Sequence, residues 1–592
     1  MTPSAQSAGA DVVTVGMLRS NLEALLDEMY QLLVRSAYST IMRESRDCSY
    51  LVVDDQGRVI LTTSGNYSHA PSYRRIVRNI LQKFGRGGLQ ADDVIITNHP
   101  YLGGVPHTPD LAVVVPVFVD DELTAFSCSI AHKPDFGGSV PGSASSSATE
   151  LYQEGFLLPP TKLYVAGQYQ QAIEDILVAN VRHPDLVLGD ARAQIGTTRV
   201  AAQRVVQLVH RYGLAETRAV FEELLRIGEQ RLRAALRTWS DGTTEVSGFL
   251  DDDGVRLDVP VRFHVRITVT GDTIHFDFSG SDDQAVGPVN VPPQYGEMAT
   301  FYALLAMADP QLTFNDGLRE PVTLTFREGS VLNPRMPAPV GAATVCSYRL
   351  TDIVLEALGH FNPASAVAHS GGSGGAMAIS WQAASPEQRP QLQYEIFGTG
   401  LGGRHGSDGV DGVAGHSTNL GVAPIEILET QFPLRVRRFE LIRDSAGPGE
   451  FRGGLSYRRD YELLREASLN RRADRIRFPG EGIDGGQPGK TGRLVLNPET
   501  PDERVLRGSG QHRFAAGSVV RFEGAGAGGC GDPLRREPTA VERDVRAGYV
   551  SVDAARDSYG VVVDPASLKV DAAATEGLRR ALRSQHEEEI QA

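Results

Sequence analysis

The chain has 592 residues, 41% of them hydrophobic and 22% charged, which is typical of a soluble globular protein with more than one packed unit. A formal net charge of −15 argues against nucleic-acid binding, because no broad basic face is available to neutralise phosphates. The N-terminus has no signal-peptide pattern, and no run reaches the roughly 18 apolar residues of a membrane span. The four cysteines are too few and too scattered for a disulfide framework. We therefore expect a cytoplasmic protein.

Apolar spacing predicts the elements of the first half of the chain. Residues 1–12 are expected to be disordered. The elements that follow are a helix over 15–38, a hairpin over 49–61, a helix over 72–84, a hairpin with strands 111–118 and 123–130, and a helical region over 186–239 broken at Gly213.

The second half is richer in alternating, strand-like patterns. Its predicted elements are strands over 259–267, 273–278, 394–397, 439–442 and 457–464, helices over 298–308 and 352–361, and a charged helix over 572–591. A basic cluster from Arg471 to Arg477 is interpreted as a solvated or interface patch.

We therefore predict a mixed α/β (α+β) chain with a compact N-terminal part and a larger β-rich remainder. The predicted division is a disordered segment 1–12, an N-terminal α/β domain 13–240, a β-rich middle domain 241–478 and a Gly-rich β region 479–592 that ends in a helix.

Two imidazoles and a carboxylate flank the predicted hairpin 111–130. His107 and Asp110 precede its first strand, and His132 follows its second. Because a hairpin brings its two ends together, these side chains are expected to face one another. Such a set can hold a divalent metal and leave positions free for water. The alternative is that the histidines only hydrogen-bond backbone groups at strand ends.

The chain also resembles a known family, the hydantoinase B/oxoprolinase family, through motifs spread over nearly its whole length. They are Asn98–Tyr101, Gly103–Gly104, His107–Asp110, Ala131–His132, Gly137–Gly138, Thr149–Gly155, Gly398–Arg404, Asp408–Gly412, His416–Asn419, Gly449–Gly454 and Gly524–Pro533. Each Gly-rich piece alone is a weak signal, but their order along the chain is specific.

The resemblance implies a metal held by His107, Asp110 and His132. Asp47 is a possible fourth ligand, or alternatively a carboxylate paired with a neighbouring arginine. Mixed nitrogen and oxygen ligands suit zinc, manganese or ferrous iron without choosing among them. His99 replaces the usual aspartate of the Asn-Asp-Pro motif, as an added ligand or as a hydrogen-bonded turn residue.

Three further residues are catalytic candidates together with Asp110. Asp135 is expected either to orient a ligand or act as a base, or to cap the turn Phe136–Gly138. Glu395 and His416 belong to a second polar group that forms a substrate pocket or, alternatively, a hydrogen-bonded turn network.

The Gly-rich segments Gly398–Arg404 and Gly524–Gly531 lack Gly-Lys-Ser/Thr, so close backbone packing or partner contact is favoured over nucleotide binding. The resemblance implies that ATP is bound by a separate A-type subunit, in a hetero-oligomer of the (αβ)2 kind.

The resemblance thus implies the metal-bearing B-type component of an ATP-dependent hydantoinase. The partner would phosphorylate the ring amide oxygen, and this chain would deliver metal-activated water to open a 5-substituted hydantoin to an N-carbamoyl amino acid. The alternatives are a subunit of an acetone- or acetophenone-type carboxylase, a 5-oxoprolinase or lactamase subunit, and a non-catalytic scaffold.

Overall fold

The chain folds into two compact units in the computed structural model, which describes residues 11–63, 65–383, 385 and 388–591. The first unit contains the residues up to Ser143 together with 148–245 and 265–344. The second contains 144–147, 246–264 and the residues from Val345 onward. The predicted disorder of residues 1–12 lies outside the described residues up to residue 10, and it is wrong for Asp11, which caps the first helix, and for Val12, which begins it. The predicted mixed α/β class is confirmed.

A six-stranded sheet forms the centre of the first unit, with strand order β1-β4-β3-β2-β5-β6. Its strands are β1 (Cys48–Asp54), β2 (Val94–Thr97), β3 (Asp110–Val119), β4 (Glu122–His132), β5 (Thr161–Val165) and β6 (Gln168–Tyr169). Strands β3 and β4 are the predicted hairpin. Almost every residue of both is buried, which explains their nearly continuous apolar sequence.

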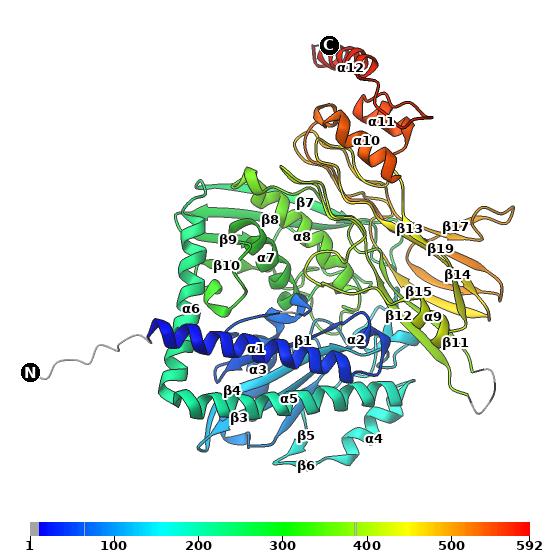
Figure 1. Ribbon diagram of the computed structural model, residues 1–592. Helices are drawn as coiled ribbons and strands as arrows, with labels where there is room; N and C mark the ends of the chain where they lie inside the picture. Colours follow the sequence, from blue (N-terminus) through cyan, green and yellow to red (C-terminus); the bar gives the residue numbers. More distant parts are fainter. Residues whose placement is uncertain (1–10, 64, 384, 386–387, 592) are drawn as a thin grey trace, which may run out of the picture. The chain divides into compact units, whose positions relative to one another are not determined.

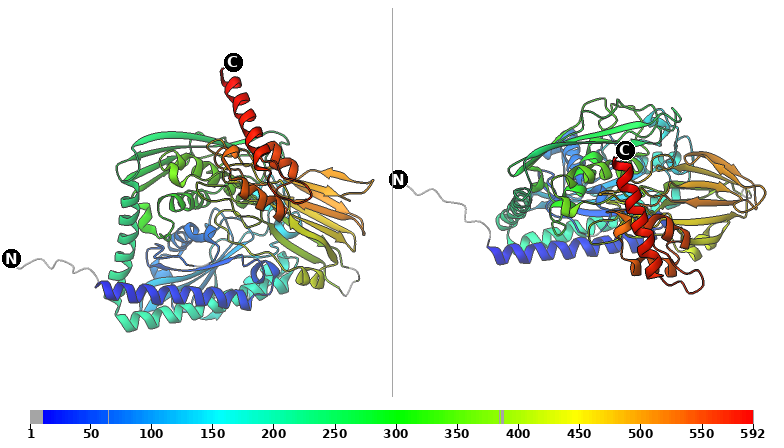
Figure 2. Two further views of the ribbon diagram at one scale, coloured as in Figure 1. Left: turned by 45° about the horizontal axis from the view of Figure 1, so that its top comes forward. Right: turned by 90° about the horizontal axis from the view of Figure 1, so that it is seen from above.

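Helices cover this sheet and extend the unit. They are α1 (Val12–Ser36), α2 (Thr40–Arg43), α3 (Ala70–Phe84), α4 (Gln171–Asn180), α5 (Pro184–Tyr212), α6 (Leu214–Leu236) and α7 (Pro293–Ala308). Helix α5 packs on β3 and β4, and α1 runs alongside α5 (Figures 1 and 2). Gly213, at φ 87°, separates α5 from α6 as predicted.

A second sheet has the order β10-β9-β8-β7. Its strands are β7 (Gly242–Leu250), β8 (Val261–Thr270), β9 (Thr273–Asp277) and β10 (Val322–Thr325). Residues 265–344 belong to the first unit because α7 packs against α3 and α6. The compact units therefore divide the chain differently from the three regions predicted from local composition and hydrophobic pattern. Local patterns do not indicate which distant segments pack together.

The second unit contains helix α8 (Ala343–Gly359), which begins at the end of the first unit, and two antiparallel sheets of orders β12-β11-β15-β18 and β13-β14-β19-β16-β17. The strands are β11 (Gly375–Trp381), β12 (Gln391–Phe397), β13 (Leu434–Leu441), β14 (Tyr457–Leu463), β15 (Ala467–Arg472), β16 (Arg493–Leu496), β17 (Arg504–Leu506), β18 (Gly510–Phe514) and β19 (Val519–Glu523). The remaining helices are α9 (Ile425–Gln431), α10 (Pro538–Ala547), α11 (Val552–Tyr559) and α12 (Ala572–Gln591).

The Gly-rich segments of the second unit pack backbone against backbone. An added Cβ would lie 1.7 Å from the Ala368 carbonyl oxygen at Gly402, and 1.7 Å from the Ser445 carbonyl oxygen at Gly526. No side chain fits at such distances. This geometry supports the packing interpretation of these segments over a nucleotide loop.

The interpretation of the basic cluster as a solvated or interface patch is wrong for Arg471 and Arg475. Arg471 and Arg475 are fully buried, and Arg471 donates through Nη1 to the Gly508 carbonyl oxygen at 3.1 Å. Arg475 pairs with the buried carboxylate of Asp352. The error arises because burial of an arginine depends on partners that lie far away in the sequence.

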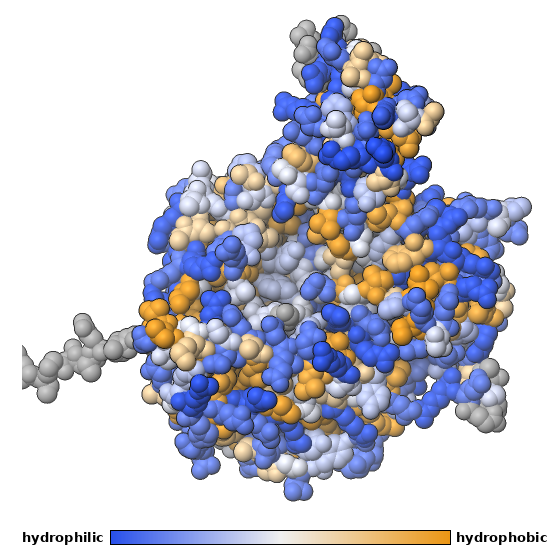
Figure 3. All heavy atoms as spheres, in the orientation of Figure 1, coloured by the Kyte–Doolittle hydropathy of each residue, from blue (hydrophilic) through white to orange (hydrophobic). Residues whose placement is uncertain are grey.

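The described part of the chain contains no helix that is both long and apolar enough to cross a membrane. Hydrophilic residues predominate on the face drawn in Figure 3, with apolar residues scattered among them. Single exposed apolar residues are normal on a protein surface.

Candidate metal centre

The β3–β4 hairpin places two of the predicted ligands opposite each other. Asp110 and His132 are paired residues at its open end, and Asp110 Oδ1 lies 3.3 Å from His132 Nδ1. His107 lies one turn before β3, with Nε2 3.3 Å from the same oxygen. The structure thus brings together the predicted set His107, Asp110 and His132, whose ligand atoms all lie within 4.8 Å of one another.

Asp47 joins this group through the pairing of β1 with β4. Cys48 pairs with Ala131, so the preceding Asp47 lies beside His132, whose backbone N–H donates to the Asp47 carbonyl oxygen at 3.0 Å. Asp47 Oδ2 lies 3.9 Å from His132 Nδ1. Its carboxylate therefore faces the histidines, as expected of a fourth ligand.

His69 is a fifth member, which the sequence analysis missed. It ends a short 3-10 turn, Tyr67–His69, and its Nε2 lies 3.9 Å from Asp47 Oδ1 and 3.8 Å from Asp110 Oδ2. The only sequence signal was its place just before the predicted helix 72–84. All five side chains are buried, and we call them the His/Asp cluster: Asp47, His69, His107, Asp110 and His132.

Hydrogen bonds to surrounding residues orient the cluster. Asn66 donates from Nδ2 to Asp47 Oδ1 at 2.6 Å. His69 Nδ1 lies 2.9 Å from the Ser49 hydroxyl, which is also 2.7 Å from the Tyr73 hydroxyl. His107 Nδ1 lies 3.4 Å from the Gly341 carbonyl oxygen. Outer contacts of this kind fix the ring orientation and leave the other nitrogen for the site.

The charges of the cluster perturb its pKa values. Burial by itself would raise the pKa of Asp110, but the neighbouring His107, His132 and His69 outweigh it and hold that pKa well below its usual range. Burial lowers the pKa of His69 despite the nearby carboxylates Asp110 and Asp47. A carboxylate that stays ionised beside a neutral imidazole is the protonation state that a metal requires.

The donors fit a divalent transition metal. Asp110 Oδ1 is buried and accepts no hydrogen bond of good geometry from the described residues, although two imidazole nitrogens lie 3.3 Å away. Leaving a buried carboxylate oxygen without a hydrogen bond costs free energy unless a cation satisfies it. Three imidazoles and two carboxylates match the ligands of zinc, manganese or ferrous iron.

Lys133, directly after His132, is a second residue that sequence reasoning did not single out. It is fully buried, and Nζ donates to Gln194 Oε1 at 2.9 Å and to the Ala131 carbonyl oxygen at 3.3 Å. Burial lowers its pKa to about 8, against the opposing effect of Asp190 and other anionic groups. It therefore provides a buried cation close to the cluster.

Asp135 is occupied by contacts within its own loop and with Arg182, which follows α4. Oδ1 accepts from the backbone N–H groups of Gly137 at 2.8 Å and Arg182 at 3.1 Å. Oδ2 accepts from Gly142 N at 2.9 Å and from Arg182 Nη1 at 3.1 Å. Of the two predicted roles, this geometry favours the capping of the turn over acid–base catalysis.

Glu395 and His416 lie in the second unit, each in a network of its own. Glu395, on β12, accepts from Arg459 Nη1 and from the Tyr461 hydroxyl, both at 2.6 Å, and all three side chains are buried. These two contacts of Glu395 therefore connect β12 to β14. These contacts favour a structural role for Glu395.

His416 Nε2 lies 2.9 Å from Asp352 Oδ1, on α8. Asp352 also accepts from Ser370 N at 2.9 Å and pairs with Arg475. Burial would raise the pKa of Asp352, but Arg475 and His416 hold it well below its usual range. The network matches the hydrogen-bonded alternative predicted for this segment.

His99 acts as the hydrogen-bond acceptor of a turn, not as a member of the His/Asp cluster. Its Nδ1 accepts from the backbone N–H groups of Tyr101 at 3.2 Å and Leu102 at 3.1 Å. An aspartate carboxylate at this position caps a turn in the same way. Burial lowers the pKa of His99 to about 4, so the ring stays neutral and keeps this role.

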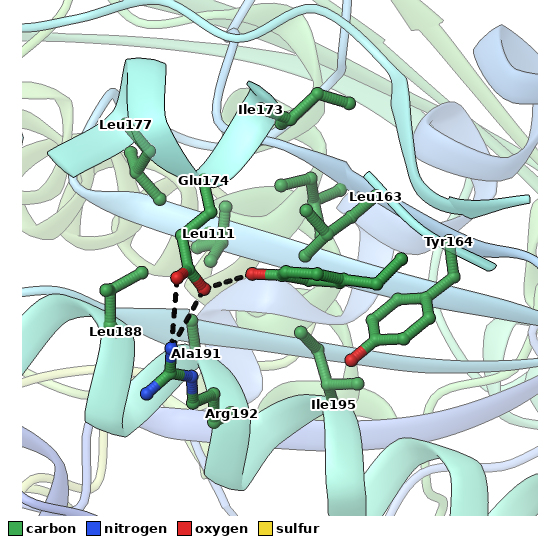
Figure 4. Close-up of a pocket in the computed structure, with 12 residues that line it drawn as sticks. Leu111, Leu163, Tyr164, Ile173, Glu174, Leu177, Leu188, Ala191, Arg192 and Ile195 are labelled. Atoms are coloured by element: carbon green, nitrogen blue, oxygen red, sulfur yellow. Dashed lines mark hydrogen bonds and ion pairs between the residues drawn. The ribbon is translucent and has the colours of Figure 1, made fainter. Parts of the chain in front are cut away.

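An apolar cavity of about 200 Å³ lies between α4, α5 and the sheet (Figure 4). Leu111 lines it beside Leu163 and Ile195, and an ion pair of Glu174 with Arg192 Nη2 at 3.0 Å crosses its edge. Leu111 follows Asp110 in β3, and successive side chains of a strand point to opposite faces. The cavity therefore lies on the face of the sheet opposite to the Asp110 carboxylate.

Comparison with known proteins identifies the class. The model of the family Hydantoinase B/oxoprolinase matches residues 11–533, so the chain belongs to that family. A protein from Pseudomonas sp. (strain NS671), provisionally named as the B component of a D-/L-hydantoinase, is 32% identical over 96% of this chain and 98% of its own length. The beta subunit of caprolactamase from Pseudomonas jessenii is 29% identical over 96% and 99%.

Solved structures agree with this assignment. The crystal structure of ATP-dependent caprolactamase from Pseudomonas jessenii has a TM-score of 0.86 at 28% identity, covering 96% of this chain and 99% of that chain. A nucleotide-free acetone carboxylase structure has a TM-score of 0.88 at 20% identity, covering 97% of this chain and 83% of that chain, which shows a shared fold. The family comprises subunits of ATP-dependent hydantoinases, oxoprolinases and carboxylases.

Proposed function

We propose that this chain is the metal-bearing subunit of an ATP-dependent cyclic-amide hydrolase that opens a 5-substituted hydantoin to an N-carbamoyl amino acid. The observation that carries the proposal is the buried His/Asp cluster in a chain related over 96% of its length to the B component of a hydantoinase. An amide ring resists hydrolysis because resonance makes its carbonyl carbon a poor electrophile. Both activation of the ring and activation of water are therefore needed.

The chain's own residues would hold the metal through His107, Asp110 and His132, with Asp47 as a further oxygen ligand. A bound divalent metal lowers the pKa of water or polarises a carbonyl oxygen. Asn66 keeps the Asp47 carboxylate in place, and the backbone of Asp47 holds the backbone of His132. His69 faces both carboxylates and is positioned to accept or return a proton there.

ATP would act through a partner. The hydantoinase and caprolactamase relatives are both named as subunits, which implies a second polypeptide in those enzymes. In 5-oxoprolinase from Dictyostelium discoideum, the matched segment covers only 38% of the protein. The remaining length leaves room there for the functions that a separate A-type subunit would supply here.

Two relatives support alternative substrates. The caprolactamase relative favours a lactam, with the same hydrolytic chemistry on a different ring. The delta subunit of acetophenone carboxylase from Aromatoleum aromaticum, 26% identical over 96% of this chain, favours carboxylation of a ketone. Neither changes the residues expected to hold the metal.

The test is co-expression of this chain with an A-type subunit, followed by an assay of ATP-dependent turnover on a hydantoin, 5-oxoproline, caprolactam and a methyl ketone. We expect ring opening of the hydantoin with stoichiometric phosphate release, and neither activity from this chain alone. ATP-dependent turnover of only the ketone with bicarbonate would replace the hydrolase by the carboxylase. ATP hydrolysis by the isolated chain would contradict the division of labour.

A further inference from the structure

A second group of metal-type donors lies in the second unit, on two turns and a Gly-rich segment that are far apart in the sequence. His405, Asp484 and Cys530 each offer one ligand atom, and these atoms lie within 4.8 Å of one another. None of the three belongs to the His/Asp cluster, which is in the first unit. The group combines imidazole nitrogen, carboxylate oxygen and thiol sulfur.

The backbone around Cys530 is held on both sides. Cys530 exchanges hydrogen bonds with Phe451, N–H to O at 2.8 Å and O to N–H at 3.0 Å. On the other side, Ile483 donates to the Gly529 carbonyl oxygen at 3.0 Å, and Gly531 donates to the Ile483 carbonyl oxygen at 3.0 Å. The backbone that carries the sulfur is therefore fixed.

The other two donors lie on tight turns that approach this sulfur. Arg404 and Ser407 exchange both backbone hydrogen bonds at 3.1 Å, so His405 occupies a two-residue turn. Gly486 donates to the Ile483 carbonyl oxygen at 2.8 Å, with Asp484 at φ 51° and Gly485 at φ 92° between them. Positive φ at both central residues is a tight-turn conformation that Asp and Gly adopt.

The distance from the imidazole to the sulfur is close to that of a tetrahedral site. His405 Nδ1 lies 3.8 Å from Cys530 Sγ, and His405 Nε2 lies 2.8 Å from Asp484 Oδ2. Zinc–nitrogen and zinc–sulfur bonds of about 2.0 and 2.3 Å at a tetrahedral angle separate the two ligand atoms by about 3.5 Å. The Asp484 side chain is 56% exposed, and its carboxylate would leave Nε2 and rotate to bind the same ion as Nδ1 and the sulfur.

The charges around the sulfur also suit a cation. Burial raises the pKa of the Cys530 thiol to about 11, and the carboxylates of Asp484 and Glu450 contribute to the increase. Two anionic groups beside a protonated thiol give a negative local potential. A divalent ion would be attracted by this potential, and its binding would displace the thiol proton.

We propose that His405, Asp484 and Cys530 form a second metal site for a zinc-class divalent ion. The site clamps the turns 404–407 and 483–486 to the Gly-rich segment that carries Cys530. Its thiolate ligand distinguishes it chemically from the His/Asp cluster, which offers only nitrogen and oxygen. A soft sulfur donor favours zinc or cobalt over magnesium or calcium.

The same three residues also have the order of a Cys–His–Asp proton relay, in which the imidazole would activate the thiol. Burial of the sulfur and its raised pKa oppose a reactive thiolate. The relay is therefore an outcome of the test and not the proposal.

The test uses the full-length chain carrying His107→Ala and His132→Ala, so that the first site is disabled. After treatment with a chelator, Co²⁺ is titrated and the thiolate-to-cobalt charge-transfer absorption in the near ultraviolet is followed. We expect one equivalent of Co²⁺ with this band, loss of the band in Cys530→Ser and His405→Gln, and affinity about 10 to 100 times weaker in Asp484→Asn.

Two control variants keep the test specific. Cys346→Ser removes a buried thiol of α8, and His512→Gln removes an imidazole of β18; both should keep the band. Melting of each variant is followed with and without Co²⁺, and the ion should raise the melting temperature only where the band is present. Absence of the band, or its persistence in Cys530→Ser, overturns the proposal. Rapid alkylation of Cys530 that depends on His405 without metal would assign the relay instead.

Discussion

Asp110 and His132 face each other across the open end of the β3–β4 hairpin, with Asp110 Oδ1 3.3 Å from His132 Nδ1. This cross-strand pair is the fixed part of the His/Asp cluster, because the ladder of the hairpin sets its register. Asp47, His69 and His107 approach the pair from the start of β1 and from two loops.

His107→Ala and His132→Ala should each remove most of the metal held by the His/Asp cluster, about one equivalent per chain, and leave the equivalent of the proposed second site. The loss of one ligand takes away much of the binding free energy and leaves a buried carboxylate without its counter-charge. Elemental analysis of purified protein checks this against His512→Ala, which changes an imidazole in the second unit. Unchanged metal in both variants would contradict the ligand assignment.

Asp110→Asn should separate the two halves of the reaction. The substitution preserves size but removes a negative charge beside three imidazoles. We expect ring opening to fall by at least about a hundredfold, the scale of losses at electrostatic catalytic groups. Phosphorylation by the partner should continue, so phosphate release and ring opening must be followed side by side. Ring opening at the wild-type rate would make Asp110 a structural residue.

Asp135→Asn should lower stability and leave the metal in place. It weakens the pairing with Arg182 and places an amide group where Gly142 N–H needs an acceptor. The free energy of unfolding should fall by about 1–3 kcal/mol, as for loss of a buried acceptor. Denaturant unfolding and metal analysis check this, with the exposed Asp175→Asn as control. Loss of turnover at full stability would restore the catalytic role.

Glu395→Gln should destabilise the second unit without affecting metal content. Arg459 and Glu395 form a fully buried pair, and removing one charge leaves the other uncompensated. Such a change costs about 3–5 kcal/mol. Calorimetry on the wild type and on the variant provides the measurement. A stable but inactive variant would instead indicate that Glu395 contacts substrate.

His99→Asp should reduce the loss of stability in acid. The unfolded chain binds a proton at His99 with a pKa of about 6.5, whereas burial lowers the folded-state pKa to about 4. Between these values the unfolded state holds more protons, so stability falls as pH decreases; above about pH 6.5 the contribution is complete. From pH 7.5 to pH 5 the wild type should lose about 2 kcal/mol at this residue.

Aspartate at position 99 can accept the same two backbone hydrogen bonds without a proton-linked penalty in this range. Denaturant unfolding at both pH values measures the difference between the two proteins. An identical pH dependence of wild type and variant would show that the pKa of His99 does not differ between the folded and unfolded states.

Local sequence determined the hairpin and the helices around it. The apolar runs 111–118 and 123–130 with a turn between them allow one pairing, and that pairing places Asp110 opposite His132. The helical spacing of 186–239 and its break at Gly213 likewise specify α5 and α6. These features depend on neighbours within about one turn or one hairpin, which a sequence displays directly.

Only the tertiary structure decided the rest of the site. Asp47 reaches His132 because β1 pairs with β4, which lies far along the chain, and His69 follows from the chain path after β1. The capping role of Asp135, the burial of Arg475 and the meeting of His405 with Cys530 have the same origin. Long-range pairing is set by the packing of whole elements, and residue spacing alone does not encode it.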